Sequence, residues 1–538
     1  MKNKILLSLV MLLTISLFVF AGCSSGNNDQ EGTNQTSQEQ EEKEQAEKPA
    51  AKKQVLTVAV PTEVLTLDPA MHRDRVTETV IRNMFDGLVT RTTDMEIVPE
   101  IAESWEQTSP TEWIFKIRQG ITFHNGEALT ADDVAFTFNR IATEGAVDGQ
   151  SSPRIGLLGP VVKVEATDEY TAKFTLSEPS PVFLAMLPFQ EVVPKDYIEE
   201  NGSEYFAKNP VGAGPFKYVK KDSKLNEQII MERYENYWGG SPDIAPVGNA
   251  QVDVVIFQIM PETASRIAAL QAGQVQIVQE IPPDMVEQLE ADSNIEVKAA
   301  DSTRERFIEL NVNKPPFDNV KVRQAMNYAV NYEEIVEYIL NGNGEALKGP
   351  YMPKGFAYND QLPGYDYNPE KAKKLLADAG YPNGFDVVID AKADEKDVAE
   401  AVANQLRDVG VNASVRVWDY AVLKEKIAEG SRLMIAANWG NGSLDPTGIL
   451  EPKFRSGGRG NFSFYGNARV DELMDKAMVE TDSEKRADQW KEIQQIIYDE
   501  APAIFGYITQ ELYAQRANVT NWDPSPDGRI NLHDVGLE

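Results

Sequence analysis

A segment in the C-terminal part of the chain combines side chains and backbone suited to holding a small molecule. It reads Asn438-Trp439-Gly440-Asn441-Gly442-Ser443-Leu444-Asp445-Pro446. The indole of Trp439 offers a flat apolar platform, while Asn438, Asn441 and Ser443 offer hydrogen-bonding groups. The glycines leave the backbone open to close contact. We expect this segment to bind a ligand; the alternative is that Trp439 is a core residue and the glycines only form a turn.

The position of this segment supports a binding role. Alternating or continuous apolar residues predict strands at 252–259, 275–278, 385–389, 411–417 and 433–437. Helical periodicity separates them at 262–272, 398–409 and 420–429. Such strand–helix–strand units build parallel sheets, whose ligands lie beyond the carboxyl ends of the strands. Two places satisfy this rule, 258–262 and the Trp439 segment, and we prefer the second. Trp418 and Tyr420 follow a neighbouring strand and could stack on the same ligand.

The chain before residue 210 also predicts mixed α/β structure. Residues 55–60 form a buried-type strand, 113–118 an alternating strand and 121–123 a further short strand. Thr130 and Asp133 have the spacing of a capping box, which predicts a helix that begins directly after Thr130.

The N-terminus predicts export and lipid attachment. Lys2 and Lys4 precede a short apolar run, and Cys23, the only cysteine, follows two small residues. This arrangement is typical of a bacterial lipoprotein signal peptide, residues 1–22, with Cys23 as the lipidated residue. Residues 23–54 lack large apolar side chains and predict a disordered stalk. The alternative is an uncleaved anchor with a free thiol.

Composition excludes several classes of function. The net charge of −32 argues against nucleic acid as a partner, and three widely separated histidines argue against a histidine-rich metal site. The chain contains no nucleophile-elbow, zinc-protease or phosphate-loop motif. We therefore expect no catalysis, no metal and no cofactor.

Motifs along the body resemble the family 5 extracellular solute-binding proteins, the receptors of peptide- and nickel-type ABC importers. The matching segments are Leu67–Pro69, Phe85–Val89, Pro99–Trp105, Trp113–Gly126 with Leu129–Val134, Asn209–Phe216, Asn236–Gly240, Pro315–Val330 and Tyr367–Tyr381. Together they extend over most of the chain after residue 54.

The resemblance implies an α/β fold, a two-lobed clamshell with an inserted α/β subdomain. Lobe I would comprise 55–98, 211–306 and 507–538; the inserted subdomain would be 99–210, and lobe II would be 307–506. Two crossing strands, near 307–311 and 504–507, would form the hinge. Ligand would bind between the lobes and stabilise their closed arrangement. The closed form would then dock on membrane permease subunits that work with a cytoplasmic ATPase.

The resemblance also implies further site residues. Met71 and His72 follow the first strand, where related receptors line the cleft, although His72 could equally be a surface histidine. Peptide receptors of the family bind the ligand's ammonium group with an aspartate, whose position here falls near Gly442. Asp445 is the only acid in the loop. The arginine that binds the ligand's carboxylate falls within 390–395, where this chain offers only Lys392.

Three functions remain open from the sequence. The first is a peptide or peptide-like import receptor, a monomer anchored by lipid to the outer face of the cell membrane, which favours a Gram-positive source. The second is a receptor of the same fold for a nickel or metallophore chelate. The third is a surface sensor or adhesin without a transport partner.

Overall fold

The computed structural model describes residues 53–244 and 247–538, and residues 53–538 form one compact unit. The predicted signal peptide, Cys23 and nearly all of the predicted stalk lie outside the described residues.

A single large sheet runs through this unit. Its order is β15-β14-β16-β12-β17-β11-β1-β10-β9-β8, with β13 paired to β17. The strands are β1 (Val55–Val60), β8 (Phe216–Tyr218), β9 (Gln228–Arg233), β10 (Val254–Ile259), β11 (Ile277–Gln279), β12 (Ile295–Leu310), β13 (Gly344–Ala346), β14 (Asp386–Ala391), β15 (Asn412–Val417), β16 (Met434–Gly440) and β17 (Ala503–Arg516). Both predicted strand–helix–strand regions therefore belong to one sheet.

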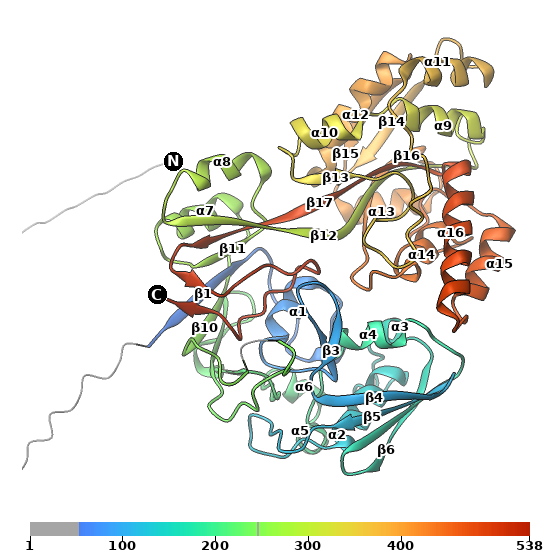
Figure 1. Cartoon of the computed structure of the whole chain (residues 1–538). Helices are drawn as coiled ribbons and strands as arrows, with labels where there is room; N and C mark the ends of the chain where they lie inside the picture. Colours follow the sequence, from blue (N-terminus) through green and yellow to red (C-terminus); the bar gives the residue numbers. More distant parts are fainter. Residues whose placement is uncertain (1–52, 245–246) are drawn as a thin grey trace, which may run out of the picture. The chain divides into compact units, whose positions relative to one another are not determined.

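The two ends of this sheet have separate cores, which defines two lobes. In the first lobe, β1 pairs in parallel with β10 and β11. In the second lobe, β14 pairs in parallel with β15 and β16. The helices of the first lobe are α1 (Arg75–Ile81), α7 (Thr263–Gln271) and α8 (Val286–Glu290). Those of the second lobe are α9 (Val320–Tyr328), α10 (Tyr332–Tyr338), α11 (Pro369–Asp378), α12 (Lys396–Asp408), α13 (Tyr420–Ala428), α14 (Leu450–Phe454), α15 (Ala468–Ala477) and α16 (Ser483–Glu500). Figure 1 shows the two groups of elements at opposite ends of β12 and β17.

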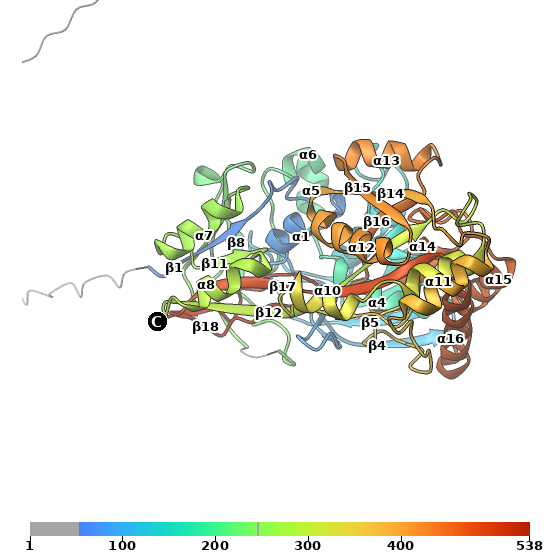
Figure 2. The ribbon, with the colours of Figure 1, turned by 90° about the horizontal axis from the view of Figure 1, so that it is seen from above.

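Strands β12 and β17 connect the lobes. They pair antiparallel from Ile295–Arg516 at one end to Glu309–Ala503 at the other. The ladder is interrupted between Asp301 and Glu305, and its register shifts again after Arg306. Figure 2 shows the two strands side by side, extending from α8 to the region of α10 and α11. They are much longer than the two short crossing strands expected from the sequence.

A third core belongs to the inserted subdomain, the region around the four-stranded sheet β4-β5-β7-β6. Its strands are β4 (Ala102–Ser109), β5 (Glu112–Ile117), β6 (Val161–Asp168) and β7 (Thr171–Leu176). Its helices are α2 (Ala131–Ala142), α3 (Ile155–Leu158) and α4 (Phe183–Met186). The next two helices, α5 (Lys195–Asn201) and α6 (Ser203–Phe206), pack Ile198 and Phe206 into the core of the first lobe. Two small ribbons, β2 (Val89–Arg91) with β3 (Ile97–Pro99) and β18 (Val519–Thr520) with β19 (Gly536–Leu537), complete the strands.

Two local predictions in this part of the chain have different outcomes. The helix after Thr130 is confirmed as α2, and the backbone N–H of Thr130 donates to Asp133 Oδ2 at 2.9 Å. The short strand expected at 121–123 is wrong, because only an isolated bridge joins Thr122 to Ala128. The Asn125-Gly126 turn folds this segment back on itself, which leaves it no second strand to pair with.

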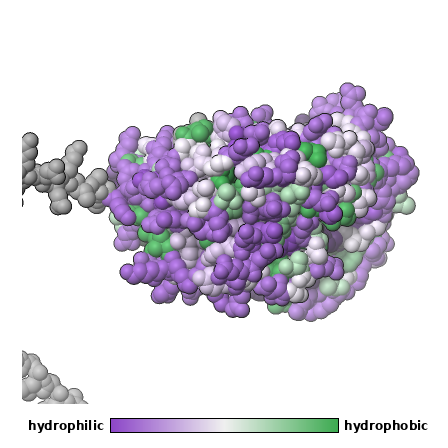
Figure 3. All heavy atoms as spheres, turned by 90° about the horizontal axis from the view of Figure 1, so that it is seen from below, coloured by the Kyte–Doolittle hydropathy of each residue, from purple (hydrophilic) through white to green (hydrophobic). Residues whose placement is uncertain are grey.

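Figure 3 shows one face of the molecule as mostly hydrophilic, with apolar residues in small scattered groups. Among the described residues, no helix is long and apolar enough to cross a membrane.

Candidate functional site

A cavity of about 560 Å³ lies between the two lobes and the inserted subdomain. Its first-lobe wall includes Arg73, Arg75, Glu78, Asp527 and Arg529. The inserted subdomain contributes residues 154–160, 178–182, Met186 and Phe189, and the second lobe contributes 439–443, 447–448, Glu451 and Arg459. Thr303 and Arg304 of β12 complete the lining. This interlobe cleft is the candidate binding site.

The predicted Trp439 segment forms much of the second-lobe wall. Trp439 lies at the end of β16, and its Nε1 donates to the carbonyl of Gly448 at 2.8 Å. The guanidinium carbon of Arg459 lies 4.5 Å from the centre of the indole ring. The ring is therefore fixed at one edge and covered by a cation, while it still borders the cleft.

Asn441 and Ser443 also line the cleft, but their side chains support the loop. The backbone N–H of Asn441 donates to the carbonyl of Thr303 at 2.8 Å, and its Nδ2 donates to the carbonyl of Asp445 at 3.0 Å. The hydroxyl of Ser443 donates to Asn441 Oδ1 at 2.8 Å. These bonds hold the loop on β12 and leave mainly its backbone to face a ligand.

Asp445 lies behind this wall in a buried ion pair. It accepts two hydrogen bonds from the guanidinium of Arg486, at 2.7 and 2.8 Å, and both residues are almost inaccessible to solvent. The structure therefore commits this carboxylate to α16 rather than to the cleft.

The resemblance to peptide receptors implies that their ammonium-binding aspartate would fall near Gly442, which lines the cleft. A Cβ atom there would lie 3.2 Å from the ring of Phe189. The carbonyl of Gly442 accepts a hydrogen bond from Arg91, which also donates to the carbonyl of Ala185 at 2.6 Å. A side chain at Gly442 would therefore require the ring of Phe189 to move by a few tenths of an ångström.

Asn438, Lys392 and Trp418 lie outside the cleft lining and bond to neighbouring side chains of the second lobe. Asn438 accepts from Arg304 at 2.8 Å and also bonds to Glu395. Lys392 lies 3.1 Å from Asp394 and 3.7 Å from Glu395. Trp418 Nε1 donates to Asp390 Oδ1 at 2.6 Å, and Tyr420 is the first residue of α13.

Met71 and His72 also lie outside the lining. Met71 packs partly against the core of the inserted subdomain. His72 is buried rather than on the surface, and neither ring nitrogen has a hydrogen-bond partner among the described residues. Burial, together with the positive charge of Arg154, lowers the pKa of His72 to about 3. The other predicted position, 258–262, likewise does not reach the cleft.

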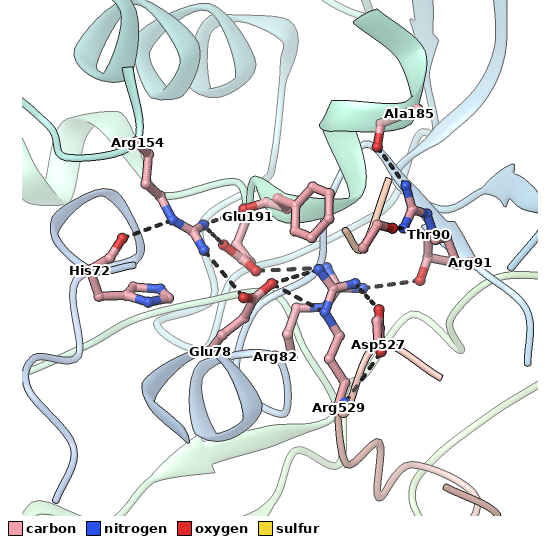
Figure 4. A network of polar contacts seen from close by, with 12 residues as sticks. His72, Glu78, Arg82, Thr90, Arg91, Arg154, Ala185, Glu191, Asp527 and Arg529 are labelled. Carbon is pink, nitrogen blue, oxygen red and sulfur yellow. Dashed lines mark hydrogen bonds and ion pairs between the residues drawn. The ribbon is translucent and has the colours of Figure 1, made fainter. Parts of the chain in front are cut away.

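Charges on the first-lobe side neutralise one another in a buried network, drawn in Figure 4. Arg529 contacts Glu78 at 2.5 Å and Asp527 at 3.2 Å. Arg154 contacts Glu191 at 3.0 Å and Glu78 at 3.8 Å. Burial alone would raise the pKa of Glu78, but Arg529 and Arg154 outweigh this effect and lower it to about 2.

The most charged part of the cleft was not predicted from the sequence. Six arginines line it, namely Arg73, Arg75, Arg154, Arg304, Arg459 and Arg529. Arg73 adjoins the predicted Met71-His72 segment and could have been found from it. The others come from distant parts of the chain, and no local motif marks them.

An interlobe cleft on an α/β scaffold with a shared pair of connecting strands defines a two-lobed receptor for small solutes. Residues 96–461 match the family model of the bacterial extracellular solute-binding proteins, family 5. The chain belongs to this family. Its members are receptors rather than enzymes.

Known relatives agree with this assignment. The chain is 31% identical to the heme-binding protein A of Haemophilus influenzae, over 76% of this chain and 78% of the relative. It is 28% identical to the glutathione-binding protein GsiB of Pectobacterium atrosepticum, over 91% of this chain and 95% of the relative. The solved structure of the periplasmic binding protein DppA of Helicobacter pylori in complex with the peptide STSA is 28% identical, with a TM-score of 0.74, covering 90% of this chain and 98% of that one.

Proposed function

We propose that this protein is the lipid-anchored receptor of an ABC importer and that it captures peptides in the interlobe cleft. The observation that carries this proposal is the Trp439 segment, which presents backbone and an aromatic ring to a cavity bordered by both lobes. Backbone N–H and C=O groups can hydrogen-bond to the main chain of any peptide, whatever its sequence. Few side chains of this wall would select one particular ligand. Relatives named for glutathione and a neighbour holding the peptide STSA support the same class.

The lobe boundaries taken from the sequence belong to this proposal. Residues 55–98, 211–306 and 507–538 would move as one body and 307–506 as the other, with the inserted subdomain riding on the first. A ligand that contacts both bodies stabilises their closed arrangement, because only that arrangement makes both sets of contacts. We propose Trp439 and the backbone of Asn441 and Ser443 as the second-lobe contacts.

Native mass spectrometry of the full chain, purified in mild detergent without refolding, tests the proposal. Bound species released and fragmented from the protein should form a series of peptide masses. A single non-peptide mass would contradict peptide capture. A metal-bearing mass would support the chelate receptor instead.

Two further tests address the anchor and the transport partner. A Cys23→Ser variant should lose the mass of the attached lipid and appear in the culture medium, while the unchanged protein stays with the membrane fraction. Cells lacking the permease should stop taking up the peptide that the receptor binds. Continued uptake would favour the sensor or adhesin function.

A further inference from the structure

The arginines that line the cleft fall into two groups. Arg75, Arg154 and Arg529 each pair with a carboxylate, from Glu511, Glu191 and Glu78 respectively. Arg73, Arg304 and Arg459 have no carboxylate within ion-pair distance among the residues that the structure describes. These three, which we call the unpaired arginines, come from both lobes and from the strand that connects them.

Arg73 and Arg459 bring like charges to one cavity from different lobes. Arg73 lies between the first strand and α1, and Arg459 follows α14. Both side chains are exposed to the cleft solvent. The cleft walls still bury part of the surroundings of Arg73, and this partial desolvation lowers its pKa; the positive charges of Arg459 and Arg154 lower it further. The guanidinium groups of Arg73 and Arg459 therefore repel each other across the cleft, and an anion bound between them would remove this repulsion.

Arg304 adds a third positive charge at the connecting strand. One Nη atom donates to the amide oxygen of Asn438 at 2.8 Å, which satisfies a donor but leaves the charge uncompensated. Burial and the charge of Arg75 lower the pKa of Arg304. A guanidinium carries five N–H donors, so most of its hydrogen-bonding capacity remains for a ligand.

Acids on the lining do not balance these charges. Glu78 and Asp527 are already paired with Arg529. Glu178 and Glu451 make no ion pair within the described part of the chain, so one of them can take the ammonium group of a peptide. Burial raises the pKa of Glu451. Three unpaired arginines thus face two acids.

We propose that the cleft selects anionic solutes, specifically short peptides with at least one carboxylate beyond that of the C-terminus. The carboxylates would lie between Arg73 and Arg459 and beside Arg304, where planar guanidinium groups can hold them in paired hydrogen bonds. An anion there turns a repulsion between the lobes into two attractions, so its binding favours closure. This inference rests on the proposed peptide-binding function and narrows it.

Calorimetric titration of the full chain in detergent, freed of co-purified ligand, tests this preference. The probes are the tripeptides Ala-Glu-Ala, Ala-Gln-Ala and Ala-Lys-Ala, which differ in charge at one side chain. We expect Ala-Glu-Ala to bind at least about 10-fold more tightly than Ala-Gln-Ala, because one charge-assisted hydrogen bond changes the dissociation constant by about this factor. Ala-Lys-Ala should bind most weakly. Raising the salt concentration should reduce the preference.

Variants assign the preference to the unpaired arginines. R73Q and R459Q should each reduce the Glu-over-Gln preference about 10-fold, while R469Q, a surface arginine on α15, should leave it unchanged. R459E should reverse the order of Ala-Glu-Ala and Ala-Lys-Ala. Circular dichroism and thermal melts confirm that each variant is folded before titration.

The outcomes separate this inference from the proposed function. Equal binding of all three tripeptides would overturn the anion preference and leave the peptide receptor standing. Binding of glutarate or phosphate without any tripeptide would support anion selection and sink the peptide assignment. A preference for Ala-Glu-Ala that survives R73Q and R459Q would also overturn the inference.

Discussion

The guanidinium of Arg486 donates two hydrogen bonds, 2.7 and 2.8 Å long, to the carboxylate of Asp445 in the buried space between α16 and the Trp439 segment. Nε of the same arginine donates to the carbonyl of Ala477 at 3.0 Å. The ion pair thus ties the end of the Trp439 segment to two helices of the second lobe. A residue that the sequence marks for ligand contact instead fixes the loop that makes the contact.

Replacing Asp445 by Asn should therefore destabilise the fold. The variant leaves the buried guanidinium of Arg486 without a counter-charge, so we expect a loss of about 3–5 kcal/mol in the free energy of unfolding, measured in guanidinium chloride. Asp475→Asn, which breaks the more exposed pair with Arg455, should cost less than about 1 kcal/mol. If Asp445 were instead a ligand contact, its replacement would lower affinity at unchanged stability.

Trp439→Ala should weaken peptide binding by about 10-fold to 100-fold, because the platform for stacking is lost. Trp439→Phe keeps a ring and loses the hydrogen bond to Gly448, so its effect should be smaller. Calorimetric titration with the co-purified peptide measures both. Trp105→Ala, in β4 and outside the cleft, is the matched control. Equal affinities for the Trp439 and Trp105 variants would exclude a stacking role.

Histidine burial predicts loss of stability in acid. The folded pKa of His72, about 3, lies below the unfolded value of 6.5, so between these values the unfolded chain binds the extra proton. The contribution of neutral His72 is complete above pH 6.5 and falls as the pH drops toward 3. Between pH 6.5 and 5 the loss is about 2 kcal/mol.

Denaturant unfolding of His72→Phe at pH 7 and pH 5 measures this contribution. Phenylalanine fills similar space without a titrating group, and His72 has no hydrogen bond to lose at its ring nitrogens within the described structure. The charged neighbours Arg154, Glu78 and Arg529 remain in both proteins and cancel in the comparison. An unchanged pH dependence in the variant would show that His72 is not the source.

Arg91→Met should loosen the contact between β2 and the Trp439 segment. Arg91 donates to the carbonyls of Gly442 and Ala185, and burial lowers its pKa to about 10. Hydrogen exchange of the amides at 442–444 should become about 10-fold faster in the ligand-free variant, since a bond of roughly 1–2 kcal/mol is lost. Arg118→Met, whose guanidinium bonds within the inserted subdomain, should leave that exchange unchanged.

The sequence predicts the parallel units well because their signals are local. Residues 385–417 alternate and then follow helical spacing, and β14, α12 and β15 lie within a few residues of the expected bounds. The rule that ligands lie beyond strand ends selects the Trp439 segment, and the structure has this segment at the end of β16 and in the lining of the cleft. The lengths of β12 and β17 could not be predicted, because the half of each strand that lies in the first lobe mixes charged and apolar residues without a regular alternation.

Only one wall of the cleft could be predicted from the sequence, because only that wall comes from a single local segment. One wall is a contiguous segment, and its aromatic and glycine residues mark it. The opposite wall assembles Arg73, Arg154 and Arg529 from positions far apart in the chain. Their proximity depends on the inserted subdomain packing beside α1, which no single window of sequence encodes. The ion pair of Asp445 could not be predicted from the sequence for the same reason, since its partner Arg486 is 41 residues away.

The interrupted ladder between β12 and β17 has a consequence for how a bound solute is sensed. Thr303 and Arg304 lie in this interruption and also line the cleft. A ligand in the proposed site would therefore contact the connecting strand β12 as well as both lobes. Rotation about a fulcrum displaces each atom in proportion to its distance from it, so a shift of a fraction of an ångström at Arg304 becomes a far larger displacement at the outer ends of both lobes. A small difference between ligands at Arg304 would thus produce a large difference in the relative orientation of the two lobes. A partner protein that docks on the outer ends of the lobes could recognise this difference.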